Sequence, residues 1–320
     1  MEIKHIEGYD CIDDSLSMIL NNNGVDIRKI FRRLWYFRFD KNSKTIGEGL
    51  MQVNDNKYKE LKECFNIDYE IYENKNRDCN IILKDFGKSN VVDIKQINEI
   101  INSKCNKKNI IILELNTFKY EYDKGFQKYT GTHTCILTEK NNEWAKIIDG
   151  WYGFYNKKMN YKNLLEAITR IIVLDISDIK EKDFESNELE EYLLDQRSIE
   201  EMKSFFNRID KINLKEEYLE LDIEMVFKAP IDKGLRKIIM NRQRFAYYLY
   251  YLSEKLENKK IKELGEYIFI IAMEWAKLRS ILIQTYFLNK VLNREHIKNI
   301  TQKIIEKEIE IKKEFGEIKW

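Results

Sequence analysis

The sequence predicts an α+β fold, with a mixed domain over residues 1–178 followed by an all-helical domain over residues 179–320. Three observations predict it. In the first part, β-branched runs between polar boundaries alternate with helical patterns. From residue 179 onward, apolar residues recur at three- and four-residue spacing, with Glu and Lys between them. The length of 320 residues also allows two domains that each bury a core.

The mixed domain is expected to open with a helix over residues 11–22, because four apolar residues fall on one helical face: Ile12, Leu16, Ile19 and Leu20. Three asparagines at 21–23 and Gly24 mark its end and form a C-terminal cap signal. The remaining patterns of this domain predict helices over 27–36, 94–102 and 161–167, and strands over 68–71, 109–115 and 171–175.

A β-hairpin is predicted over residues 132–149. Its strands are Thr-His-Thr-Cys-Ile-Leu-Thr at 132–138 and Trp-Ala-Lys-Ile-Ile-Asp at 144–149, joined by the polar turn 140–143. The outer ends of two such strands lie side by side. His133 and Asp149 are therefore expected to be neighbours.

The second domain is predicted to contain helices over 187–211, 233–257, 260–293 and 294–316. Residues 229–234, which include the only proline, Pro230, are predicted to break the chain between helices. This half is interpreted as a helical bundle or a helical cap on the first domain.

Composition excludes several classes of protein. Hydrophobic residues make up 43% and aromatic residues 12%, which is not the profile of a disordered chain. The 55 basic and 54 acidic side chains nearly cancel, so overall charge favours neither nucleic acid nor an anionic membrane as a partner. We find no export signal and no apolar run long enough to span a membrane, and expect a cytoplasmic location.

The five cysteines are widely spaced, form no CxxC pair and are expected to be reduced. With only three histidines, none at ligand spacing from a cysteine pair, we expect no metal site and no cofactor. Cys135 is expected to pack in the core, and structural roles are expected for Cys64, Cys79 and Cys105. Asp13 and Asp14 are interpreted as first-turn helix carboxylates.

Cys11 is the predicted catalytic nucleophile. It follows the loop Gly8-Tyr9-Asp10 and opens the first helix, where backbone amides and the helix dipole favour a negative sulfur. His133 is the predicted base, and Asp149 would fix its tautomer and stabilise its imidazolium form. The catalytic order along the chain is then Cys, His, Asp.

Three segments carry a resemblance to a known family. They are His5-Ile-Glu-Gly-Tyr-Asp-Cys11, Gly131-Thr-His133 and Ile147-Ile-Asp149-Gly150. Over roughly the first 175 residues this layout resembles papain-like cysteine peptidases of the C39-like type. Among them it is similar to acyltransferases of natural-product assembly, namely the butirosin biosynthesis protein H family and the transglutaminase-like cysteine protease homologue of closthioamide assembly.

The resemblance implies a papain-like domain that takes an acyl or peptidyl group from a carrier-protein thioester and gives it to an amine. Phosphopantetheine would enter only as part of the carrier-protein substrate, and the acceptor would be a small amine or diamine. The family draws an oxyanion donor from a Gln six positions before the Cys. Here His5 stands at that position, so His5 and the Cys11 backbone amide are the predicted oxyanion hole.

The expected function is thus a cysteine-dependent acyltransferase that forms amide bonds through an acyl-Cys11 intermediate. Two alternatives stay open: a cytoplasmic cysteine peptidase or amidase that hydrolyses the acyl-enzyme, and a catalytically inactive papain-like binding protein. Aromatic residues add a candidate substrate groove, although core packing or an interface between the halves would also explain them. Its members are Trp151, Tyr152, Tyr155, Tyr247 and Tyr251.

Overall fold

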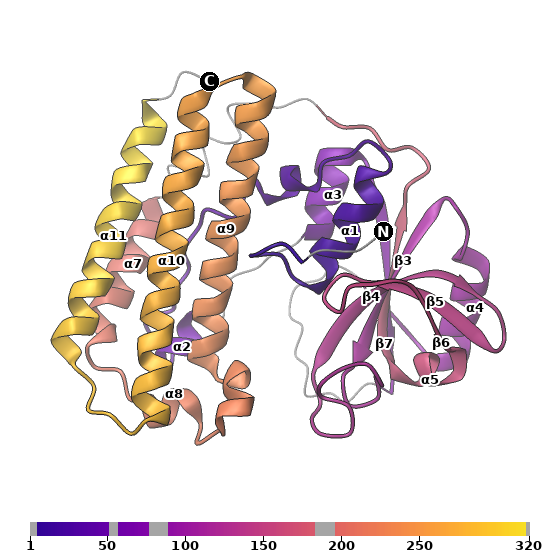
Figure 1. Cartoon of the computed structure of the whole chain (residues 1–320), viewed down its shortest axis with the longest axis horizontal. Coiled ribbons are helices and arrows are strands. Elements are labelled where there is room, and N and C mark those ends of the chain that lie inside the picture. Colours follow the sequence, from indigo (N-terminus) through magenta and orange to yellow (C-terminus); the bar gives the residue numbers. More distant parts are fainter. Residues whose placement is uncertain (1–4, 51–56, 77–88, 183–195, 318–320) are drawn as a thin grey trace. The chain divides into compact units, whose positions relative to one another are not determined.

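The structure is a computed structural model that describes residues 5–50, 57–76, 89–182 and 196–317 (Figure 1). It is an α+β protein that divides into two compact units. The first, which we call the mixed unit, comprises residues 1–27 and 56–183. The second, which we call the helical unit, comprises residues 28–55 and 184–320.

The mixed unit is built on a seven-stranded sheet with the strand order β2-β1-β7-β3-β4-β5-β6. β1 and β2 run parallel, and every other neighbouring pair is antiparallel. The strands are β1 (Asp68–Asn74), β2 (Asn90–Val92), β3 (Asn109–Asn116), β4 (Thr132–Lys140), β5 (Trp144–Asp149), β6 (Phe154–Asn160) and β7 (Ile168–Asp175).

Helices cover both faces of this sheet (Figure 1). α1 (Cys11–Asn21) and α3 (Lys57–Phe65) lie on one face, and α4 (Ile94–Lys104) and α5 (Tyr161–Ala167) lie on the other. On the α4 and α5 face, alternate strand residues form a buried core with the two helices. That core includes Cys135 and Ile147, so the sheet face that carries them is closed to water.

The structure confirms the first helix and the hairpin of the mixed unit. Asn141 shapes the hairpin turn, because its side-chain oxygen accepts from the amides of Glu143 and Trp144 at 2.9 and 2.8 Å. The sequence analysis missed β6, the strand at the edge of the sheet. Its Asn-Lys-Lys-Met composition lacks the β-branched signal, and lysines are common on edge strands because they discourage pairing with other chains.

The helix predicted over 27–36 is wrong. Only a 3₁₀ turn, η1 (Ile27–Phe31), forms there. After it the chain runs extended, and backbone amides bond to side chains of another helix, α7 (Gln196–Ile209). The Phe37 amide donates to Ser198 Oγ at 3.1 Å and the Phe39 amide donates to Glu201 Oε2 at 2.7 Å. These bonds replace the helical ones.

The helical unit contains α7 and three longer helices that pack alongside one another (Figure 1). The predicted bundle is therefore observed, although residues 187–195 of its first predicted helix lie outside the described residues. Pro230 opens a helix as its first residue, and Gly234 lies inside that helix rather than in a break. The further helices are α2 (Ile46–Leu50), α8 (Leu214–Tyr218), η2 (Ile223–Lys228), α9 (Pro230–Leu256), α10 (Lys259–Phe287) and α11 (Arg294–Gly316).

Residues 28–55 belong to the helical unit, which corrects the predicted division into 1–178 and 179–320. The buried Glu217 carboxylate accepts from the Ile46 and Gly47 amides at 2.6 and 2.9 Å. A Cβ on Gly47 would lie 2.0 Å from the Ile231 backbone nitrogen. The close approach places α2 against α9 and the hydrogen bonds join α2 to α8, and neither is visible as a local sequence pattern.

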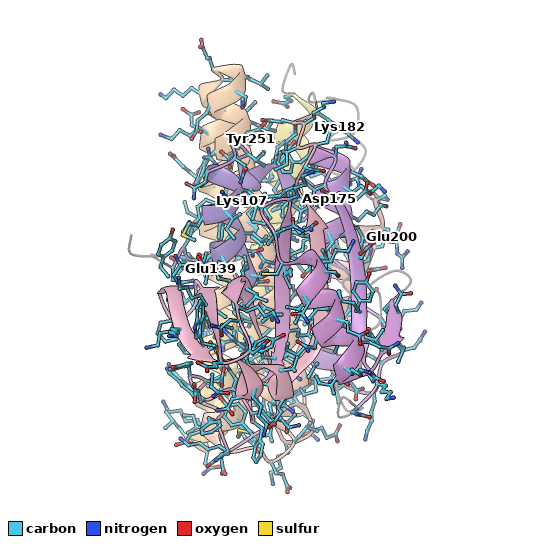
Figure 2. All side chains as sticks on the ribbon, turned by 90° about the vertical axis from the view of Figure 1, so that its right-hand side faces the viewer. Lys107, Glu139, Asp175, Lys182, Glu200 and Tyr251 are labelled. Atoms are coloured by element: carbon cyan, nitrogen blue, oxygen red, sulfur yellow. The ribbon has the colours of Figure 1, made fainter. Side chains whose placement is uncertain are left out.

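A buried ion pair lies at the centre of the helical unit. Arg242 donates to both Glu308 oxygens, at 3.1 and 2.7 Å, and Trp275 Nε1 donates to Glu308 Oε1 at 2.8 Å. Charged residues such as Lys107, Glu139 and Glu200 are exposed instead (Figure 2). Among the described residues, no helix has the length and apolar character needed to cross a membrane.

Candidate functional site

Cys11 is the first residue of α1, at an N-terminus with a complete cap. The Asp10 side chain accepts from the Ile12 and Asp13 amides, and Asp13 reciprocates with the Asp10 amide. Lys57 Nζ bonds to Asp10 and Asp13 at 2.9 and 2.6 Å. The cap fixes where the helix begins, and this fixes the position of the half-buried Cys11 in its first turn.

His133 and Asp149 form a buried pair at the outer ends of β4 and β5, as the hairpin predicted. His133 Nε2 donates to Asp149 Oδ2 at 2.7 Å, and the Asp149 side chain is fully buried. Tyr120 Oη donates to the same carboxylate oxygen at 3.1 Å, while its ring stacks on the imidazole at a centroid distance of 5.5 Å. Because Nε2 bonds to Asp149, Nδ1 is the ring nitrogen that is left for the hydrogen bond with Cys11.

A close contact joins α1 to the end of β5. The Gly150 amide donates to Ser15 Oγ at 2.9 Å, and Ser15 Oγ donates to the Cys11 carbonyl at 3.2 Å. A Cβ at position 150 would lie 2.3 Å from Asp14 Cβ, so only glycine allows this approach. Since Gly150 directly follows Asp149, the contact holds the Cys11 helix beside the His133–Asp149 pair.

The electrostatics of the site favour a charged imidazole. Burial lowers the pKa of His133, but hydrogen bonds with Asp149 and Cys11 outweigh it and raise the pKa from 6.5 to about 10. His133 is therefore an imidazolium at neutral pH. It can give a proton to a leaving group and take it back in the next step.

Thr134 is a further neighbour of the sulfur, which the sequence analysis did not single out. Its Oγ1 lies 2.7 Å from Cys11 Sγ. Thr134 follows His133 near the start of β4, the strand that contacts α1, and Cys11 is the first residue of that helix.

Asp14 is a first-turn carboxylate of α1, as predicted, and it also binds His5. The Asp14 Oδ2 atom lies 2.6 Å from His5 Nδ1, and its Oδ1 accepts from the Ile6 amide at 3.1 Å. Burial raises the pKa of Asp14 in spite of these hydrogen bonds. Asp14 lies one helical turn after Cys11, and no local sequence pattern linked it to His5.

The aromatic groove candidates fall into different environments. Tyr152 is half-buried with its ring 5.2 Å from the imidazole of His133, and Trp151 meets the edge of His5 at 4.9 Å. Trp151 and Tyr155 are 51% and 43% exposed, which excludes core packing for these two residues. A groove that they would line stays a prediction.

The other two groove candidates belong to the helical unit. Tyr251 is buried there beside Tyr248, and Tyr247 contacts the rings of Tyr250 and Phe269. Packing within α9 and against α10 accounts for the positions of these two tyrosines in part. Their role in substrate binding also stays a prediction.

The described cysteines, which exclude Cys79, form no disulfide. Cys135 is fully buried in the sheet core, and burial raises its pKa well above the ordinary value. Cys64 is buried, and burial also raises the pKa of the half-buried Cys105. Of these residues only Cys11 contacts both a histidine and a hydroxyl. No group of three potential metal ligands occurs in the described ranges.

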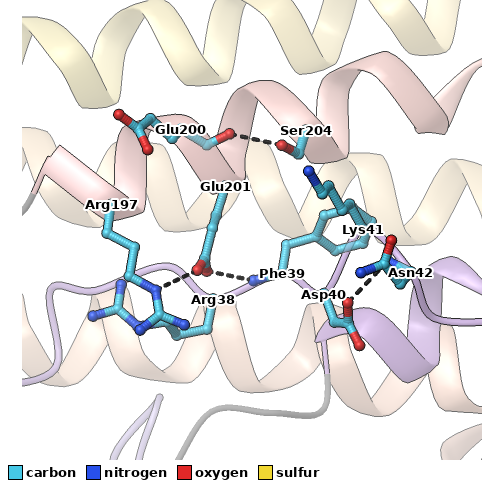
Figure 3. A pocket seen from close by; sticks show the side chains of 9 residues that line it. All are labelled: Arg38, Phe39, Asp40, Lys41, Asn42, Arg197, Glu200, Glu201 and Ser204. Carbon is cyan, nitrogen blue, oxygen red and sulfur yellow. Dashed lines mark hydrogen bonds and ion pairs between the residues drawn. The ribbon is translucent and has the colours of Figure 1, made fainter.

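A separate pocket of about 420 Å³ lies in the helical unit (Figure 3). It is lined by residues 38–42 and the start of α7. Glu201 accepts there from Arg197 Nε at 2.6 Å and from the Phe39 amide at 2.7 Å. The pocket contains none of the predicted site residues, and the Glu201 carboxylate joins its two segments.

No protein-family model matches the chain, and no curated protein matches its sequence.

Proposed function

We propose that the chain is a cysteine-dependent acyltransferase with a papain-like mixed unit, in which Cys11, His133 and Asp149 form the catalytic triad. One observation carries the proposal: a half-buried cysteine at a capped helix N-terminus contacts an imidazole that a buried carboxylate holds at 2.7 Å. Nucleophile, base and orienting acid in this arrangement are the components of acyl transfer through a covalent intermediate.

The first half-reaction loads Cys11. Its thiolate attacks the carbonyl carbon of an acyl or peptidyl thioester on a carrier protein. The tetrahedral intermediate collapses as the carbon–sulfur bond to the phosphopantetheine breaks. The imidazolium of His133 gives its proton to the departing sulfur, which leaves an acyl-Cys11 thioester and a neutral His133.

The second half-reaction transfers the acyl group to an amine. The amine nitrogen attacks the acyl-Cys11 carbonyl, and His133 accepts the proton that the nitrogen loses. The bond to Cys11 Sγ then breaks, which restores the thiolate and the imidazolium and releases an amide. A small amine or diamine is the proposed acceptor, and the reducing cytoplasm is the proposed location because it keeps the nucleophile reduced.

The oxyanion of both intermediates needs hydrogen-bond donors. The Cys11 amide is one of those at a helix start that have no intrahelical acceptor. His5 supplies the second donor in the proposal, since Asp14 occupies its Nδ1 and fixes the ring. The buried Asp14 would thus position His5 for this role.

Intact mass spectrometry with an acyl-loaded carrier protein tests the proposal. The wild-type chain should gain the mass of the acyl group, and Cys11→Ala should gain none. Cys105→Ala is the matched control, because Cys105 is another half-buried thiol with no histidine partner and should load normally. Amide formation that survives Cys11→Ala would refute the mechanism.

Addition of amines separates transfer from the two alternatives. A transferase converts the acyl-enzyme to an amide in the presence of a small amine or diamine. A peptidase or amidase releases the free acid whether or not the amine is present. An inactive binding protein forms no adduct, and its Cys11 reacts with iodoacetamide no faster than an ordinary exposed thiol.

A further inference from the structure

The hydroxyl of Thr134 has an unusual environment. It is half-buried, and among the described residues Cys11 Sγ, at 2.7 Å, is its only hydrogen-bond partner. Buried and half-buried hydroxyls usually bond to backbone or water. A hydroxyl aimed at a sulfur from a neighbouring strand indicates a function at that sulfur.

The direction of this hydrogen bond follows from the state of His133. With its pKa raised to about 10, His133 is an imidazolium at neutral pH, so both of its ring nitrogens are donors. The sulfur beside it accepts a hydrogen bond and cannot be a donor to the same ring. A sulfur that accepts from His133 as an anion has further lone pairs, and the Thr134 O–H can donate to one of them.

We propose that Thr134 is a further catalytic residue, whose hydroxyl donates a hydrogen bond to the Cys11 thiolate. The inference deepens the proposed function and rests on it, because a stabilised thiolate matters only if Cys11 is the nucleophile. Thr134 and His133 then bind the same sulfur from consecutive positions of β4. In the second half-reaction the hydroxyl donates to Cys11 Sγ as the bond to the acyl carbon breaks, and so stabilises the negative charge that develops on the departing sulfur.

Several titratable groups surround the sulfur and contribute to its behaviour. Asp10 precedes it, His133 and Cys135 come from β4, and Asp149 comes from β5. Glu114 is the strand partner of Thr134 on β3. None of these groups changes when only the hydroxyl of Thr134 is removed, so a Thr134 variant isolates its contribution.

The test is the pH dependence of Cys11 alkylation by iodoacetamide, followed by mass spectrometry of the peptide that contains Cys11. Thr134→Val keeps the shape of the side chain and removes the donor. Because a hydrogen bond to a charged group is lost, the alkylation midpoint should rise by about one to two pH units. Thr134→Ser should restore the wild-type midpoint. Thr134→Ala provides a second hydroxyl-free variant if valine disturbs folding.

Thr138→Val is the matched control on the same strand. The Thr138 hydroxyl donates to the Lys146 carbonyl at 3.1 Å and has no contact with Cys11, so the alkylation midpoint should not move. A midpoint that falls in Thr134→Val would show that the hydroxyl accepts from a neutral thiol, and an unchanged midpoint would show that it is silent. Either result overturns the proposal.

Alkylation requires no acyl donor, which keeps the two proposals separable. A raised midpoint together with no acyl adduct would retain the role of Thr134 at the sulfur and retire the acyltransferase function. A normal acyl adduct with an unchanged alkylation midpoint would retain the acyltransferase function and remove the role of Thr134.

Discussion

Asp149→Asn is the sharpest perturbation of the site, because it changes a charge and almost no volume. The carboxylate is fully buried and accepts from His133 Nε2, Tyr120 Oη and the Tyr152 amide at 2.7, 3.1 and 3.3 Å. Loss of a hydrogen bond between two charged groups removes about 1.5–3 kcal/mol. That corresponds to a fall of about one to two units in the pKa of His133.

The sign of the change is fixed by the environment of the imidazole. Burial lowers the pKa of His133 and is the largest single influence on it, while Asp149 and Cys11 raise it to about 10. Without the carboxylate, burial is less opposed. The pKa of His133 should therefore fall by about one to two units in Asp149→Asn, and acyl loading of Cys11 should slow by about 10–100-fold.

NMR titration of the imidazole protons measures the shift directly. The chain has three histidines, so His5→Gln and His296→Gln assign the remaining signal to His133. Asp178→Asn is the control, because Asp178 is an exposed aspartate of the same unit. A His133 midpoint that is the same in wild type and Asp149→Asn would refute the electrostatic account of the pair.

Three further outcomes are expected. The stability that charged His133 contributes is complete below about pH 6.5 and is lost as the pH rises through about 10, so urea unfolding should show that His133→Gln destabilises the protein more at the lower end of this range. Gly47→Ala, which would place a Cβ 2.0 Å from the Ile231 nitrogen, should destabilise the helical unit by about 3 kcal/mol or more in urea, whereas Gly316→Ala should have little effect because nothing lies within 4 Å. His5→Ala should slow acyl loading by about 100–1,000-fold and His5→Gln should retain most activity if His5 is an oxyanion donor; equal rates in all three proteins would exclude that role.

Local patterns were sufficient for the parts of the site that depend on neighbours in sequence. Asp10 caps the helix that Cys11 opens, and the turn at Asn141 forms a hairpin that brings His133 to Asp149. These contacts follow from capping and strand pairing, whose geometry repeats from protein to protein. The three- and four-residue spacing of apolar residues predicted the long helices of the second half.

Contacts between segments that are distant in the sequence left no local sequence pattern by which to predict them. A helix was predicted over 27–36, but the side chains of Ser198 and Glu201 hold the following backbone in an extended form. Tyr120 stacks on His133 from an irregular segment after β3, and no periodicity marks it.

The sequence by itself determined the two-part α+β organisation, the helix start at Cys11 and the partnership of His133 with Asp149. The tertiary structure decided which unit holds residues 28–55, that Asp14 binds His5 and that Thr134 reaches the sulfur. The physical reason is the distance along the chain over which each contact forms. Helix capping and the spacing of apolar residues depend on residues a few positions apart, whereas the close approach of Gly150 to Asp14 exists only once the sheet and its helices have packed.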